Sequence, residues 1–158
     1  VVALAMVFGT GFVASPTAFD IHTELAAQTY DLGSGDLRPV AGGGLAGVPD
    51  LGGANLTAVA SRVAEEGDIM HYAGQNGCRL TYMRGGFALP EGKSTSEKQI
   101  ASWGSRDQQR HIIVATGMDR TRFDAIARYL RLETRERASE SAMAALSKTV
   151  RSARPCVG

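Results

Sequence analysis

Cysteine is scarce in this sequence of 158 residues, which contains only Cys78 and Cys156. Two cysteines are too few for a disulfide framework or for a zinc site built from thiolates. One bridge between them is compatible with an oxidising compartment, but sequence does not supply pairing geometry, so the pairing stays open. The metal-binding patterns HExxH and CxxC are also missing, and no metal site is indicated.

Net charge is nearly absent as well. The chain carries 17 basic and 16 acidic residues, for a formal net charge of +1. This balance gives no electrostatic case for a nucleic-acid partner. The hydrophobic content of 44% is ordinary for a globular protein, and the length is enough for one domain with a core.

The first charged residue of the chain is Asp20. The run before it almost reaches the length of about 20 apolar residues that a membrane-spanning helix needs. No Lys or Arg appears until Arg38, so the positive-inside rule places the chain after this run outside the cytoplasm. We therefore expect residues 1–19 to be a transmembrane segment that is truncated at its start. A signal peptide and a buried soluble helix are the alternatives.

Residues 20–55 are expected to form a short helix and a glycine-rich linker. The apolar spacing over residues 20–30 fits an amphipathic helix, capped by Asp20 or Thr23. The glycine-rich stretch from Gly33 to Gly53 lacks periodicity and is typical of a linker.

A change to β-type alternation begins at Leu56. It predicts five strands, with Thr57, Val59, Ser61 and Val63 on one face of the first. We expect consecutive hairpins, a tight turn at Asn76-Gly77 and a sheet with one buried and one wetter face. The predicted strands cover residues 56–64, 69–74, 78–84, 99–105 and 110–118.

A helix is predicted after the last strand. Asp119 is a good N-cap, and apolar residues recur at helical spacing from Phe123 to Leu130. The expected fold is therefore α+β, with an antiparallel sheet of about five strands packed by a C-terminal helix within residues 56–131. Residues 132–158 are expected to be a charged tail, either helical or disordered.

Candidate catalytic groups do not assemble into a known pattern. The three histidines, His22, His71 and His111, are scattered. His71 and His111 lie on predicted strands and could approach each other across the sheet, but no third ligand is suggested. Ser102 is not in a nucleophile elbow, and no carboxylate is placed to orient His111. Cys78 suits a small buried residue better than a nucleophile. We assign no catalytic, cofactor-binding or metal-binding residue and expect no enzyme.

The junction at Gly117 is a strand entering a helix, which is where nucleotides bind in many folds. A dinucleotide site needs three spaced glycines in a parallel unit, and only one is present here. Asp119 also places a carboxylate where a bound anion would lie. We interpret the junction as architectural.

The order of these segments resembles the extracytoplasmic part of transmembrane anti-sigma factors from proteobacteria. The resemblance covers residues 1–131. It implies a single pass through the inner membrane, a non-catalytic periplasmic domain and control of an extracytoplasmic-function sigma factor in transcription regulation. The matching segments are Pro49-Asp50-Leu51, the stretch from Tyr72 to Tyr82, Trp103, residues 112–117 and the helix from Asp119.

The cytoplasmic zinc-type domain of that family is not in this sequence. The implied partners are thus a sigma factor bound through that absent domain, the membrane, and a periplasmic regulator or protease, with no cofactor and no nucleic acid. The linker from Gly33 to Gly53 is the expected place of cleavage. The alternative is a membrane-anchored or secreted periplasmic enzyme or ligand-binding module.

Overall fold

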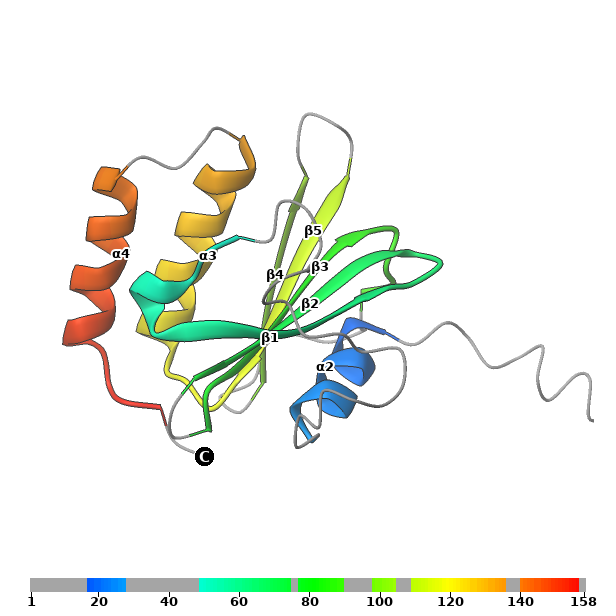
Figure 1. Cartoon of the computed structure of the whole chain (residues 1–158), viewed down its shortest axis with the longest axis horizontal. Helices are drawn as coiled ribbons and strands as arrows, with labels where there is room; N and C mark the ends of the chain where they lie inside the picture. The colour runs from blue at the N-terminus through cyan, green and yellow to red at the C-terminus, as the bar shows by residue number, and fades with distance from the viewer. Residues whose placement is uncertain are drawn as a thin grey trace, which may run out of the picture.

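The computed structural model describes residues 17–27, 49–74, 77–89, 98–104, 109–135 and 140–156. These residues form an α+β fold in which a five-stranded antiparallel sheet lies between helices on both faces (Figure 1). The strands are β1 (Leu56–Val63), β2 (Gly67–Gly74), β3 (Arg79–Gly85), β4 (Lys98–Gly104) and β5 (Arg110–Thr116). The helices are α2 (Ala18–Ala26), the 3-10 helix η1 (Gly52–Ala54), α3 (Arg120–Arg135) and α4 (Glu140–Ser152).

The strand order is β1-β2-β3-β5-β4, so the prediction of consecutive hairpins is wrong for the connection from β3 to β4. Strand β5 lies between β3 and β4 and pairs with both in antiparallel register. Five successive β5 residues, from His111 to Ala115, are buried, which suits a central strand. In strand β4 only Gln99 is buried and the other positions are partly or fully exposed, which suits its place at the edge.

Both faces of the sheet centre are buried, which corrects the expectation of one wetter face. In β3, four successive residues from Leu80 to Met83 are buried. The reason is that α2 covers one face while α3 packs on the other, with α4 beside it (Figure 1). Alternation within a strand did not reveal the second layer, because α2 belongs to a distant part of the sequence.

Strand β1 contains a β-bulge between Ala58 and Ala60. Thr57 pairs with Ala73 and Ser61 with Met70, so the bulge leaves Thr57 and Ser61 on opposite faces of the sheet. The prediction of one common face is wrong for this strand, because a single extra residue reverses the alternation.

Helix α2 begins earlier than predicted and is capped by Thr17 rather than by Asp20 or Thr23. The Thr17 hydroxyl accepts from the Asp20 backbone N–H at 3.4 Å, and the Asp20 carboxylate accepts from the Thr17 N–H at 3.0 Å. This capping box lowers the pKa of Asp20, chiefly through the backbone hydrogen bond from Thr17. Ile21 and Leu25 face the sheet and are buried there.

The membrane segment and the linker fall mainly outside the described part of the chain, which excludes residues 1–16 and 28–48. In the residues that are described, no helix is long and apolar enough to cross a membrane. Residues 75 and 76 are likewise not described, so the type of turn at Asn76-Gly77 stays a prediction.

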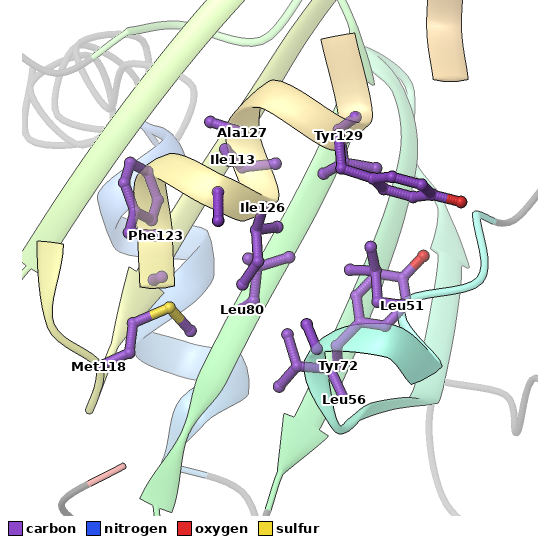
Figure 2. Close-up of a cluster of buried hydrophobic side chains, with 14 of the residues drawn as sticks. Leu51, Leu56, Tyr72, Leu80, Ile113, Met118, Phe123, Ile126, Ala127 and Tyr129 are labelled. Carbon is purple, nitrogen blue, oxygen red and sulfur yellow. The ribbon is translucent and has the colours of Figure 1, made fainter. Parts of the chain in front are cut away.

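The predicted packing of α3 on the sheet is confirmed. Phe123 and Ile126 are fully buried against the sheet (Figure 2), and Leu130 is fully buried in the same cluster. Helix α3 continues beyond residue 131 to Arg135. The helical alternative holds for residues 140–152, where α4 adds Leu146 and Val150 to the same core.

Candidate functional site

Two of the three histidines meet beneath α2. His22 Nδ1 and His71 Nδ1 each lie 2.7 Å from the hydroxyl of Thr81, and His22 Nε2 lies 2.9 Å from that of Thr116. The Thr81 hydroxyl has one proton, so it donates to only one Nδ1 and accepts from the other. When both rings are neutral, they therefore differ in whether Nδ1 carries the proton.

Burial keeps both of these rings neutral. It lowers the pKa of His22 to about 4, with smaller effects from Lys98 and Arg79. Burial also lowers the pKa of His71 to about 3, and the charges of His22 and Arg79 add to that shift. Because His22, His71 and Thr81 are fully buried, a substrate cannot reach this network. Its role is to hold α2 on the sheet.

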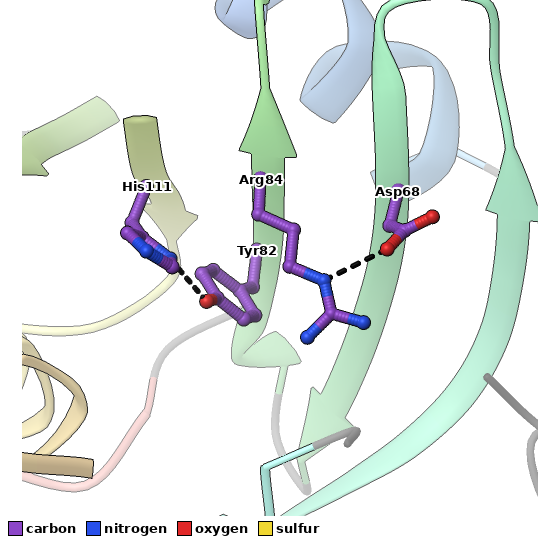
Figure 3. Close-up of polar contacts among 4 residues, drawn as sticks. All are labelled: Asp68, Tyr82, Arg84 and His111. Atoms are coloured by element: carbon purple, nitrogen blue, oxygen red, sulfur yellow. Dashed lines mark hydrogen bonds and ion pairs between the residues drawn. The ribbon is translucent and has the colours of Figure 1, made fainter. Parts of the chain in front are cut away.

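His111 lies on the opposite face from His71, so the expected approach of these two histidines does not occur. His71 faces α2, whereas His111 hydrogen-bonds Tyr82 on the α3 side (Figure 3). Ser102 pairs with Ile112 in the sheet register and is thereby turned away from His111. Over the described ranges no three His, Cys, Asp or Glu residues are placed to hold a metal ion.

A row of polar and aromatic residues crosses the sheet beside the end of α3. Asp68 pairs with Arg84, Arg84 with His111, and His111 with Trp103 in the register of four strands. Asp68 accepts from Arg84 Nε at 2.8 Å (Figure 3). The rings of Tyr82, His111 and Trp103 stack on one another. A pocket of about 280 Å³ beside this row has both Arg84 and Glu133 in its lining. Opposite charges in one small pocket do not favour a ligand of either sign.

The strand-to-helix junction has the predicted architecture. Gly117 has φ 78°, a left-handed conformation that favours glycine. Asp119 caps α3, since its Oδ1 accepts from the Arg122 backbone N–H at 2.9 Å. Asp124 forms an ion pair with Arg120 one turn away, at 3.0 Å. The carboxylate of Asp119 thus occupies the helix start, as expected.

Cys78 and Cys156 form a disulfide, with 5.2 Å between their Cα atoms. The bond joins the start of β3 to the segment after α4. Cys78 is fully buried, as predicted for a small apolar side chain. Whether the two cysteines pair was left open by the sequence, and the structure shows that they do. The bond also fixes the last described residues against the sheet.

A pocket next to this disulfide has a volume of about 680 Å³. We call it the Arg122 pocket. Among its described lining residues the charged side chain is that of Arg122, which is only 6% exposed. The lining residues are Gly52, Asn55, Leu56, Thr57, Ala73, Gly74, Arg122, Pro155 and Cys156.

Sequence reasoning missed Arg122. The signal was present, because Arg122 precedes Ile126 and Leu130 by one and two helical steps of four residues and so belongs to the buried stripe of α3.

Comparison with models of protein families, with curated proteins and with solved structures gives no match for this chain.

Proposed function

We propose that this chain is the outer, non-catalytic part of a membrane-anchored anti-sigma factor. In this proposal residues 1–16 belong to a single pass through the bacterial inner membrane, and the domain that follows lies in the periplasm. It controls the release of a sigma factor that is held by a cytoplasmic domain outside this sequence. Its other partner is a periplasmic regulator or protease.

The main support is the way in which the family-like segments pack together. The Pro49-Asp50-Leu51 segment meets the hairpin strand β2, because the Tyr72 hydroxyl donates to the Pro49 carbonyl at 2.7 Å. Leu51 and Tyr72 are both buried in the core beneath α3. The segments that carry the resemblance are therefore parts of one folding unit rather than separate matches.

The disulfide supports the proposed location in the periplasm. Disulfide bonds persist in the periplasm and outside the cell, whereas cytoplasmic thiols are kept reduced. A bridge between Cys78 and Cys156 is consistent with a domain outside the cytoplasm.

Helix α2 comes directly after residues 1–16, and the hydrogen bonds of His22 hold it on the sheet. In this proposal a force on the membrane segment would therefore act first on this helix.

Co-purification tests this proposal. The full-length protein, including the segment before Val1, should retain the sigma factor encoded beside it, whereas residues 1–158 alone should not. Removing residues 49–156 from the full-length protein should leave binding intact but abolish its response to the inducing condition. Failure of the full-length protein to bind the sigma factor would refute the proposal.

A second candidate function is ligand binding outside the cytoplasm, and the Arg122 pocket favours it. Ligand sites are commonly concave, with volumes of about 300–1,000 Å³ and a few convergent polar groups. The Arg122 pocket, at about 680 Å³, lies in that range. This candidate would be favoured if the chain bound a ligand in the pocket and the full-length protein did not bind the sigma factor.

A further inference from the structure

The guanidinium of Arg122 is a buried positive charge without a carboxylate partner among the residues that the structure covers. Its Nη1 donates to the Ala54 carbonyl at 3.4 Å, and its Nη2 donates to the Arg154 carbonyl at 3.2 Å. Its Nε has no hydrogen-bond partner within the described ranges. Each ion pair found in the described ranges joins other residues.

Such a charge is costly. Moving an ion out of water costs several kcal/mol even after relaxation, and hydrogen bonds to two carbonyls return part of this but leave the charge unneutralised. An oxyanion next to Arg122 would both neutralise the charge and accept charge-assisted hydrogen bonds, for which guanidinium geometry is well suited. The buried arginine thus favours an anion in the adjacent pocket.

The rest of the lining is compatible with an anion. Among the described lining residues, Asn55 has a side-chain amide that can donate, and none is acidic. Asp124, the nearest carboxylate in sequence, pairs with Arg120. The two oxygens of Asp119 accept from the backbone N–H groups of Arg122 and Arg154, at 2.9 and 3.3 Å.

We propose that the Arg122 pocket binds a small organic anion through a carboxylate or phosphate group. Arg122 supplies the charge, Asn55 supplies a further donor, and the apolar lining at Leu56 and Pro155 contacts the remainder of the ligand. The volume of about 680 Å³ is larger than an isolated oxyanion needs. This inference does not depend on the anti-sigma proposal.

The disulfide holds one wall of this pocket. Cys156 and Pro155 line it, and Cys78 fixes that segment to the start of β3. The same segment supplies the Arg154 carbonyl that accepts from Arg122. The oxidised chain is therefore the form to use in binding experiments.

Amide NMR spectra of the oxidised chain test the proposal, with sodium phosphate and sodium succinate as probes at constant ionic strength. At least one anion should cause saturable shifts at the amides of Ala73 and Gly74. Tighter binding of phosphate would identify a phosphate site, and tighter binding of succinate a carboxylate site. The absence of a saturable shift with both anions would overturn the proposal.

Two pairs of variants locate the charge that binds. Arg122→Met should weaken binding about tenfold or more, because a hydrogen bond to a charged group is lost. Arg128→Met removes an exposed arginine of the same helix and should leave affinity unchanged.

The second pair avoids the buried core. Pro155→Glu places a carboxylate at an exposed position of the pocket lining and should also weaken binding about tenfold or more, by repulsion and by competing for Arg122. Val63→Glu adds the same charge at a position that is 67% exposed and is not one of the described lining residues. Equal effects of Pro155→Glu and Val63→Glu would overturn the proposal even if Arg122→Met fails to fold.

Discussion

Lowering the pH from about 7 to about 5 should destabilise the fold by about 4 kcal/mol through His22 and His71 alone. Both rings are fully buried, and their folded-state pKa values are about 4 and about 3, below the ordinary value of 6.5. The unfolded chain therefore takes up protons first as the pH falls. Stability is complete above about 6.5 and declines below it.

The magnitude comes from this linkage. Each histidine contributes a slope of about 1.4 kcal/mol per pH unit between its unfolded and folded pKa values. At about pH 5 each has lost about 2 kcal/mol, and the loss levels off only below about pH 4 for His22 and about pH 3 for His71. The positive charges of Lys98 and Arg79 act in the same direction.

Urea unfolding at the two pH values measures this effect. The control is the double variant His22→Gln, His71→Gln, whose amides can still hydrogen-bond Thr81 but do not titrate. Subtracting the pH dependence of this variant removes the contributions of His111 and the carboxylates. Wild type should lose about 4 kcal/mol more than the double variant. An identical pH dependence for the two proteins would refute the account of the buried histidines.

Three further changes test the packing. Phe123→Ala should cost about 3–5 kcal/mol and lower Tm, whereas Leu132→Ala at a position 45% exposed on the same helix should have little effect; equal losses would contradict the packing of α3. Reducing the disulfide should cost about 4–5 kcal/mol in urea unfolding, since Cys78 and Cys156 are 78 residues apart, and a bridge-free double Cys→Ala variant should not respond to the reductant. Thr81→Val should cost about 2–4 kcal/mol by removing the shared partner of two buried rings; unchanged unfolding would argue against the network.

Local features were predictable from the sequence. The cap at Asp119, the apolar stripe from Phe123 to Leu130 and the glycine at 117 depend on residues that are close together in the chain, and the structure places them as expected. These signals have a direct physical cause within one or two helical turns.

The strand order and the buried polar groups were not predictable in this way. Thr81 and His22 are 59 residues apart in the sequence, and Arg122 and Ala54 are 68 apart. No local sequence pattern predicts either contact. The position of β5 between β3 and β4 likewise depends on burial from both sides, which only the assembled layers determine. The bulge in β1 adds one residue to a strand without a sequence signature.

The disulfide also fixes the covalent topology of the chain. A peptide bond cut anywhere between Cys78 and Cys156 would leave two fragments that are still joined through sulfur. A cut between α2 and Pro49 would instead leave α2 attached to the domain only by side-chain packing and hydrogen bonds. A protease could therefore separate the sheet from the preceding segment only by acting before Cys78, unless the bridge had first been reduced.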